Sequence, residues 1–168
     1  AAMKHGISYL PEDRKRDGII GDLSVRDNII LARQVLDGFF HPISKAKAEK
    51  YAEEYIRLLS IKTASTDTPI KSLSGGNQQK AIIAREIDRD PKLLVAVQPT
   101  RGLDVGAIEY IHRQIVAERD KGKAVLLVSL ELDEVMNLSD RILVMYEGEI
   151  VGEFDPKTTT VQELGLYM

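Results

Sequence analysis

The stretch KSLSGGNQQK, from Lys71 to Lys80, places two glycines and a short polar run at the start of a predicted helix. Apolar residues recur at helical spacing in the segment that follows, AIIAREID. Ser74 then occupies the N-cap position, where serine stabilises a helix start without any need for glycines after it. Glycine in the first turn weakens a helix by roughly 0.5–1 kcal/mol relative to alanine. We therefore expect another group to approach the backbone at this point.

Anion binding is the chemistry that such a turn can perform. The amides at a helix N-terminus and the positive end of the helix dipole favour a phosphate group. The glycines would let a phosphate approach the backbone, and the hydroxyl of Ser74 can hydrogen-bond one of its oxygens. A glycine turn before an ordinary capped helix is the alternative, and SGG alone favours that alternative. The neighbouring motifs must decide between the two.

The composition excludes several function classes. Of the 168 residues, 43% are hydrophobic and 29% are charged, which is ordinary for a soluble globular protein of one domain, or of one core with a small subdomain. A net charge of −3 argues against a nucleic-acid partner. The absence of cysteine excludes disulfides, thiolate catalysis and cysteine-based zinc sites. The three histidines are isolated from one another, so we predict no metal site: His5, His41 and His112.

The first half of the chain reads as mostly helical after one short strand. The predicted elements are a strand at Gly6–Leu10, a charged loop at Glu12–Gly18, a helix starting at Ser24–Asp27, a second helix opened by Pro42 and Ser44, and a polar segment at Lys62–Ser72. Within the charged loop, Arg14, Lys15 and Arg16 are interpreted as solvated.

The second half alternates strands and helices. The predicted elements are strands at Leu93–Val97 and Ala124–Leu130, a helix carrying Ile108, Ile111 and Ile115, a short helix around Glu131–Met136, a hairpin turning at Glu147-Gly148, and a last helix with a capping box from Thr160 to Glu163. This order implies an α/β fold with a largely parallel sheet. We expect three parts: a strand and loop over 1–18, a helical subdomain over 19–88 and an α/β part over 89–168.

Together these motifs resemble the ATP-binding cassette (ABC) ATPases. LSGGNQQ looks like the family's signature motif, which implies that the residues at its centre bind the γ-phosphate of an ATP held on an opposing cassette: Ser74, Gly75, Gly76, Asn77 and Gln78. KLLVAVQPT stands in the place of the Walker B strand, and Gly102, Leu103 and Asp104 in that of the D-loop. YLPEDR resembles the Q-loop, and LLVSLE the switch-histidine segment. The resemblance implies a partial P-loop NTPase core with a helical subdomain inserted before it.

The sequence also departs from the family pattern. No G-x-x-x-x-G-K-[ST] motif occurs, so the Walker A part is missing. Val97 and Gln98 stand where the family has the Walker B Asp-Glu pair, Leu130 where it has the switch histidine, and Glu12 where it has the Q-loop glutamine. Valine offers no oxygen to a metal, and a neutral amide is a poor base. We interpret this site as naturally degenerate, with no intact catalytic residue, and expect the chain alone neither to hydrolyse ATP nor to bind it tightly.

More narrowly, LPEDRKRDG, LSGGNQQK and PTRGLDVGA resemble the second cassette of two-cassette importers for sugars or nucleosides. This implies a partner cassette (the first cassette of the same parent protein or a second copy), permease subunits in the membrane, and ATP with Mg²⁺ in the complete transporter. It also implies a cytoplasmic location on the inner face of the cell membrane. Because the Q-loop-like stretch begins near the N-terminus, we interpret the chain as a fragment, which could form homo-oligomers.

Two other hypotheses remain. The chain could be a non-catalytic module whose degenerate cassette serves for dimerisation or regulation. It could also be a soluble ABC ATPase of translation or DNA repair, but such proteins usually keep both Walker motifs, so this hypothesis ranks last. The transported solute is not determined by these motifs, and the surroundings of Gln98 favour a nucleoside over a sugar.

Overall fold

The computed structural model describes residues 2–37 and 43–167. The chain divides into two compact units, Ala1–Leu126 and Leu127–Met168. The helical segment predicted over 19–88 and the first strand of the predicted α/β part lie in the first unit. Pro42 and His41, which the sequence analysis singled out, lie outside the described residues.

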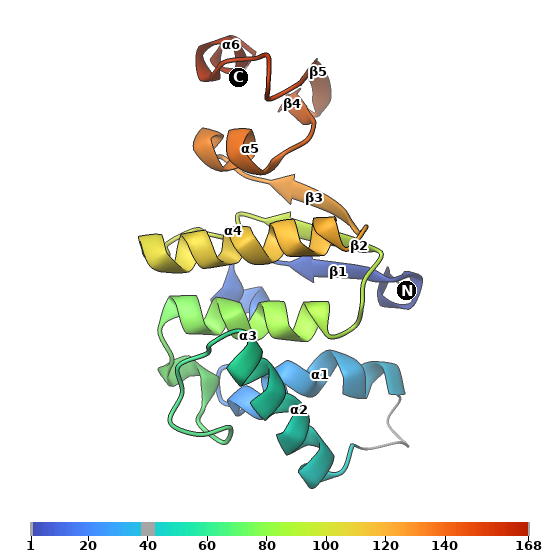
Figure 1. Cartoon of the computed structure of the whole chain (residues 1–168), viewed down its shortest axis with the longest axis vertical. Helices are drawn as coiled ribbons and strands as arrows, with labels where there is room; N and C mark the ends of the chain where they lie inside the picture. Colours follow the sequence, from blue (N-terminus) through green and yellow to red (C-terminus); the bar gives the residue numbers. More distant parts are fainter. Residues whose placement is uncertain (1, 38–42, 168) are drawn as a thin grey trace. The chain divides into compact units, whose positions relative to one another are not determined.

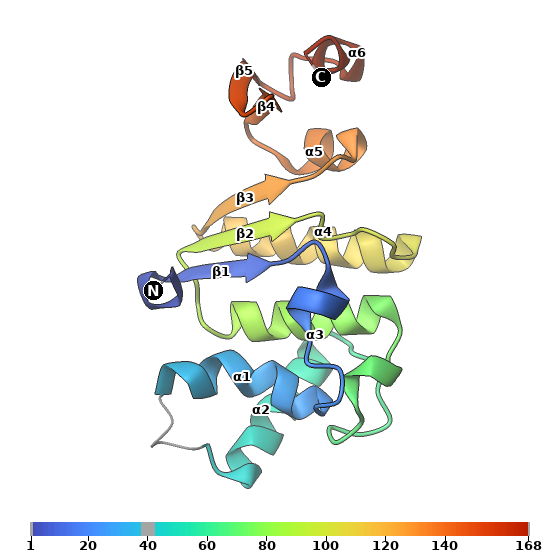
Figure 2. The same ribbon diagram turned by 180° about the vertical axis from the view of Figure 1, so that it is seen from behind.

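A parallel sheet organises the first unit. Its strands are β1 (Ile7–Leu10), β2 (Leu93–Val97) and β3 (Ala124–Val128), in the order β1-β2-β3, and β3 continues into the second unit. The strands β1 and β2 pair in parallel, although more than eighty residues separate them in the sequence. Figure 2 shows the three strands side by side. The predicted strands and their parallel pairing are confirmed for β1 and β2.

Three helices lie on one side of this sheet. They are α1 (Val25–Asp37), α2 (Lys45–Leu58) and α3 (Gly75–Ile87), and α3 lies between β1 and the other two helices (Figure 1). The predicted helix starts are confirmed. The hydroxyl of Ser24 accepts a hydrogen bond from the Asp27 amide at 3.0 Å, and that of Ser44 accepts one from the Lys47 amide at 3.4 Å. A short 3₁₀ turn, Ile70–Ser72, precedes α3.

The core of the first unit joins the sheet to α3 and to α4 (Val105–Asp120). Each of these elements contributes a side chain that is at most 2% exposed: Leu10, Ile82, Leu94 and Ile111. Full burial of a side chain of this size stabilises the fold by about 1.5–3 kcal/mol. The core therefore fixes where the N-terminus of α3 lies relative to the loops that follow β1 and β2.

The charged segment predicted as a loop contains a turn of π-helix, Arg14–Gly18. The carboxylate of Asp13 caps it by accepting hydrogen bonds from the amides of Lys15 at 3.1 Å and Arg16 at 3.0 Å. The Ile19 amide closes the turn on the Arg14 carbonyl at 2.9 Å. The loop prediction is wrong here. A single wide turn held by a capping side chain is too short to produce a hydrophobic periodicity in the sequence.

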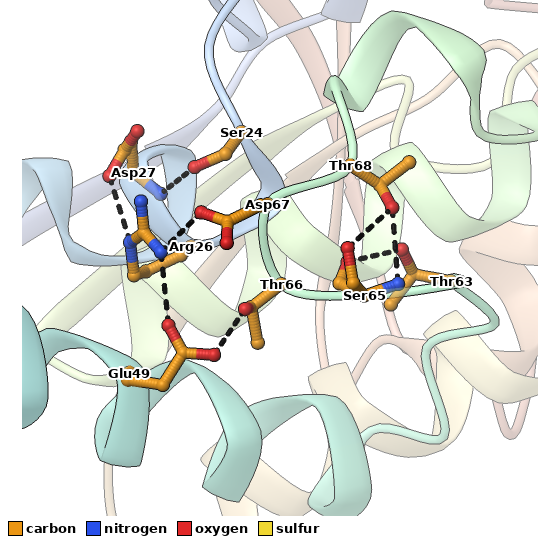
Figure 3. Close-up of polar contacts among 9 residues, drawn as sticks. All are labelled: Ser24, Arg26, Asp27, Glu49, Thr63, Ser65, Thr66, Asp67 and Thr68. Carbon is orange, nitrogen blue, oxygen red and sulfur yellow. Dashed lines mark hydrogen bonds and ion pairs between the residues drawn. The ribbon is translucent and has the colours of Figure 1, made fainter.

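A largely buried arginine connects α1, α2 and the segment that leads toward α3 (Figure 3). The side chain of Arg26 is 11% exposed and forms ion pairs with Glu49 at 3.0 Å and Asp67 at 2.5 Å. The hydroxyl of Thr66 donates a hydrogen bond to the Glu49 carboxylate. A guanidinium removed from water needs such partners. The network therefore holds in place the polar segment that leads to the LSGG stretch.

The second unit contains α5 (Leu132–Leu138), the antiparallel hairpin of β4 (Ile142–Tyr146) and β5 (Glu149–Phe154), and α6 (Val161–Gly165). The hairpin is confirmed, and Glu147 and Gly148 have φ angles of 47° and 86° at its turn. Such a pair of positive φ angles matches the right-handed twist of hairpin strands.

The capping box predicted for α6 is half confirmed. The Thr160 hydroxyl accepts a hydrogen bond from the Glu163 amide at 3.2 Å. The carboxylate of Glu163 accepts instead from the hydroxyl of Thr159 at 2.7 Å. Both interactions hold α6, whose Leu164 packs with Ile142 and Val144 in the core of this unit.

Candidate functional site

The LSGG stretch forms the N-terminus of α3, with Ser74 at the predicted N-cap position. Its hydroxyl does not cap a backbone amide and accepts instead from the side-chain amide of Asn77 at 2.9 Å. The carbonyl oxygen of the Asn77 side chain in turn accepts from the Lys62 amide at 2.8 Å. The start of the helix is thereby tied to the polar segment after α2.

Gln78 is turned into the protein and is 3% exposed. Its side-chain amide donates to the carbonyl oxygens of Leu73 at 3.0 Å and Ile70 at 3.3 Å. A buried amide of this kind stabilises the turn before α3, where the Ile70 carbonyl also accepts from the Leu73 amide at 3.1 Å. The Gln78 side chain thus holds the backbone on the N-terminal side of the two glycines from within the protein.

The two glycines of the stretch are each approached by a different side chain. A Cβ added to Gly75 would lie 2.7 Å from Nη2 of Arg14, and one added to Gly76 would lie 2.9 Å from the Cβ of Ala107. At Gly75 a side chain would require the end of the Arg14 side chain to move, whereas at Gly76 it would meet a Cβ that is fixed to the backbone of α4. The expected close approach is therefore found, and within the chain it is made by a guanidinium and a methyl group.

Arg14 also contacts the loop that follows β2. Its Nη1 donates a hydrogen bond to the Arg101 carbonyl oxygen at 2.7 Å. The side chain of Arg101 reaches back and forms an ion pair with Glu12. The Q-loop-like and D-loop-like segments thus meet beside Gly75. The prediction of a solvated side chain holds only in part for Arg14, which is partly buried and contacts segments distant in the sequence.

The D-loop-like segment leads directly into α4. Asp104 is the N-cap of that helix, and its Oδ1 accepts from the Ala107 amide at 2.9 Å. Its Oδ2 lies 3.8 Å from the position of a Cβ added to Gly76. The Leu103 amide donates to the Thr100 carbonyl at 3.1 Å, which shapes the preceding turn. The N-termini of α3 and α4 therefore face each other across the second signature glycine.

The end of β2 carries the two positions at which the family pattern has Asp-Glu. Val97 is the last residue of the strand, and Gln98 has a φ of 47°, in the left-handed region. That conformation costs a non-glycine residue roughly 1–2 kcal/mol. Leu130 is 76% exposed and belongs to the second unit, between β3 and α5.

The residues present fit a phosphate better than a metal ion. At Gly75 the start of a helix and the Arg14 guanidinium both place positive charge, which favours an anion. At the end of β2 the side chain of Val97 offers no oxygen for Mg²⁺. No group of three or more His, Asp or Glu side chains that could hold a metal occurs within residues 2–37 and 43–167. In the same ranges, no helix is long and apolar enough to cross a membrane.

Lys80 is the last residue of the KSLSGGNQQK stretch and links α3 to α4. Its ammonium group lies 4.1 Å from the centre of the Tyr110 ring and donates to the Ser60 carbonyl at 3.1 Å. Burial, with a further contribution from nearby Lys62, lowers the pKa of Lys80. Burial also raises the pKa of Tyr110. This pair packs the helices together one turn beyond the glycines.

The comparison with protein families identifies the class. The ABC transporter family matches residues 1–101. The chain therefore belongs to this family. The nucleoside import ATP-binding protein NupA of Lactococcus lactis is 49% identical over 98% of this chain and 33% of its own length. The guanosine import protein NupO of Bacillus subtilis is 49% identical over 97% and 32%, and the ribose import protein RbsA of Clostridium tetani is 43% identical over 99% and 33%.

The chain thus spans about a third of the length of these relatives. Solved structures show the same fold. The ATP-binding cassette MJ0796, in a dimeric post-hydrolysis state with ADP and phosphate, has a TM-score of 0.75 at 23% identity over 91% of this chain and 64% of that chain. A nucleotide-free cassette of an ABC transporter has a TM-score of 0.74 at 22% identity over 99% and 66%. The predicted α/β ABC ATPase fold with a parallel sheet is confirmed.

Proposed function

We propose that the chain is part of the ATP-binding subunit of an ABC importer for simple sugars or nucleosides. The observation that carries this proposal is the 49% identity to nucleoside and guanosine import proteins over nearly the whole chain. The ribose import protein is 43% identical, so nucleosides are favoured. In this function, ATP hydrolysis by the complete transporter drives the import of the solute.

In the proposed mechanism, the chain supplies half of an ATP site to a partner cassette. Ser74, Gly75 and Gly76 contact the γ-phosphate of an ATP whose other phosphates and Mg²⁺ are held by the partner. The N-terminus of α3 and the nearby Arg14 guanidinium support this role by their positive charge. Val97 and Gln98 leave the chain's own half of the second site without a Mg²⁺ ligand or a catalytic base.

The partners follow from this arrangement. The opposing cassette is the first cassette of the parent protein or a second copy of this one. Permease subunits hold the pair at the cytoplasmic face of the membrane. The alternative is a degenerate cassette used for dimerisation or regulation. It would meet a partner cassette through the same surface, but the signature would have no role in ATP binding.

The test uses the complete parent protein with its permease, assayed for ATP hydrolysis and solute uptake. Ser74→Arg places a long cation where the phosphate should lie, and we expect both activities to fall by about a hundredfold or more. Thr158→Arg, an exposed substitution of the same kind in the second unit, is the control and should leave both unchanged. Full activity of Ser74→Arg would overturn the signature role. The dimerisation alternative would then lead, and it predicts that Asp104→Arg abolishes assembly.

A further inference from the structure

Arg14 is placed by the turn that carries it. The π-helical turn ends at Gly18, where an added Cβ would lie 2.7 Å from Cδ1 of Ile82 in α3 and 3.3 Å from the Cβ of Arg14. The Asp13 cap fixes the beginning of the same turn. The turn is therefore packed against α3 one to two helical turns beyond Gly75, and it directs the arginine along the helix toward its N-terminus.

The guanidinium then fills the space between the first signature glycine and the turn before α4. Its Nη2 is near Gly75, and a Cβ added to Gly102 would lie 3.8 Å from the same atom. Its Nη1 is bonded to the Arg101 carbonyl. The Nε atom is buried and has no hydrogen-bond partner among the described residues. A planar group with several fixed donors suits this position, whereas a lysine ammonium is a compact charge at the end of a flexible chain.

The other charges of the segment do not make this connection. Lys15 and Arg16 are exposed, and the Arg16 guanidinium pairs with its neighbour Asp17 at 3.0 Å. The ion pair of Arg101 with Glu12 joins the same two segments, but its side chains are 66% and 48% exposed. An exposed pair of this kind contributes about 1 kcal/mol or less. Arg14 therefore lies against Gly75 and is hydrogen-bonded to the turn at Arg101.

We propose that Arg14 is a positioning residue that holds the start of the signature and the D-loop-like turn as one surface. The consequence rests on the proposed function: both segments would then meet the partner cassette's ATP site at a fixed separation. The contact of Arg14 with Gly75 and Arg101 lies within this chain and does not depend on the partner. A side chain at position 75 would displace the guanidinium, so the glycine there leaves Arg14 in place even before any phosphate binds.

A double-mutant cycle tests the contact in the 168-residue chain. Gly75→Ala should lower the melting temperature by about 2–6 °C, because the new methyl group strikes Arg14. In the Arg14→Ala background the same substitution should cost less than half as much. Gly76→Ala is the matched control: it meets Ala107, so its effect should be equal in both backgrounds. Additive effects of Arg14→Ala and Gly75→Ala would overturn the proposal.

Amide hydrogen exchange separates positioning from a general loss of stability. The amides of Gln78, Arg101 and Leu103 close the two turns by hydrogen bonds to Ser74, Gln98 and Thr100. We expect about tenfold faster exchange at all three in Arg14→Ala, a smaller increase in Arg14→Lys, and none in Lys15→Ala. The Lys92 amide, bonded to the Gly6 carbonyl at the start of the sheet, should be unchanged. Unchanged exchange at the three amides, or an equal increase at Lys92, would contradict the positioning role.

Both experiments are independent of transport, so the two proposals can fail separately. Non-additive effects in the double-mutant cycle together with full activity of Ser74→Arg would support the Arg14 contact and overturn the signature role in the proposed function. Additive effects in the cycle together with an inactive Ser74→Arg transporter would overturn the Arg14 contact and support the signature role. If Arg14→Ala does not fold, the cycle is run with Arg14→Lys, and exchange at Arg101 in Gly75→Ala still reports whether a change at one segment reaches the other.

Discussion

Gly76 in α3 faces Ala107 in α4 so closely that a Cβ on the glycine would lie 2.9 Å from the Cβ of the alanine. The two helices can approach at this point only because one of the two positions lacks a side chain. The same approach brings the Asp104 carboxylate to the signature. Packing between the helix N-termini therefore sets the geometry of the candidate ATP-binding surface.

We expect Gly76→Ala to lower the free energy of unfolding by about 1–3 kcal/mol, because the added methyl group overpacks the contact. Ala107→Gly should recover part of that loss in the double variant, since it removes the opposing methyl group. Gly106→Ala is the control: its Cβ would make an ordinary contact at 3.5 Å with Asp104. Urea denaturation measures all four proteins, and a Gly76→Ala chain as stable as the wild type would contradict the packing argument.

Asp104 caps α4, so removing its side chain should lower the stability of the chain independently of any role in ATP binding. Asp104→Ala should lower the free energy of unfolding by about 0.5–2 kcal/mol, whereas Asp104→Asn keeps an accepting oxygen and should lose much less. Thermal unfolding of the chain measures both. If Asp104→Asn is stable but inactive in the complete transporter, the carboxylate has a role across the cassette interface as well. Equal losses in both variants would show that the cap geometry is not what matters.

Glu49 should make the helical segment sensitive to acid. The hydrogen bond from Thr66 and the ion pair with Arg26 lower the pKa of this carboxyl from its ordinary 4.5 (Figure 3). A carboxyl with a lower pKa in the folded state contributes stability that is complete above its unfolded pKa and is lost as the pH falls through the folded one. Melting temperatures from pH 7 down to pH 3 should therefore fall less steeply below about pH 4.5 in Glu49→Gln than in the wild type. Glu53→Gln, an exposed change on the same helix, should follow the wild-type curve more closely.

Gln98 adopts a left-handed backbone conformation, which glycine accepts more readily than any other residue. Gln98→Gly should raise the free energy of unfolding by up to about 1 kcal/mol, since the relief of strain exceeds the added flexibility of the unfolded chain. Gln114→Gly, in the interior of α4, should have the opposite sign and cost about 0.5–1 kcal/mol. A destabilised Gln98→Gly variant would mean that the side chain makes a compensating interaction at this turn.

Much of the local structure could be read from the sequence. The capping serines at the starts of α1 and α2, the turn at Glu147-Gly148 and the apolar strands before and after the helical segment all depend on residues within a few positions of one another. Caps and turns are short-range interactions, so their residue patterns suffice to predict them. The π-helical turn was missed because its capping carboxylate lies in an unpatterned charged run.

By itself the sequence determined that LSGG opens a helix, that a parallel α/β core follows and that the chain resembles ABC ATPases. Only the tertiary structure decided what lies against the two glycines. The guanidinium of Arg14 and the methyl of Ala107 reach Gly75 and Gly76 from distant parts of the chain. No local pattern records such contacts, because they depend on how the core places the loop after β1, the start of α3 and the start of α4 relative to one another.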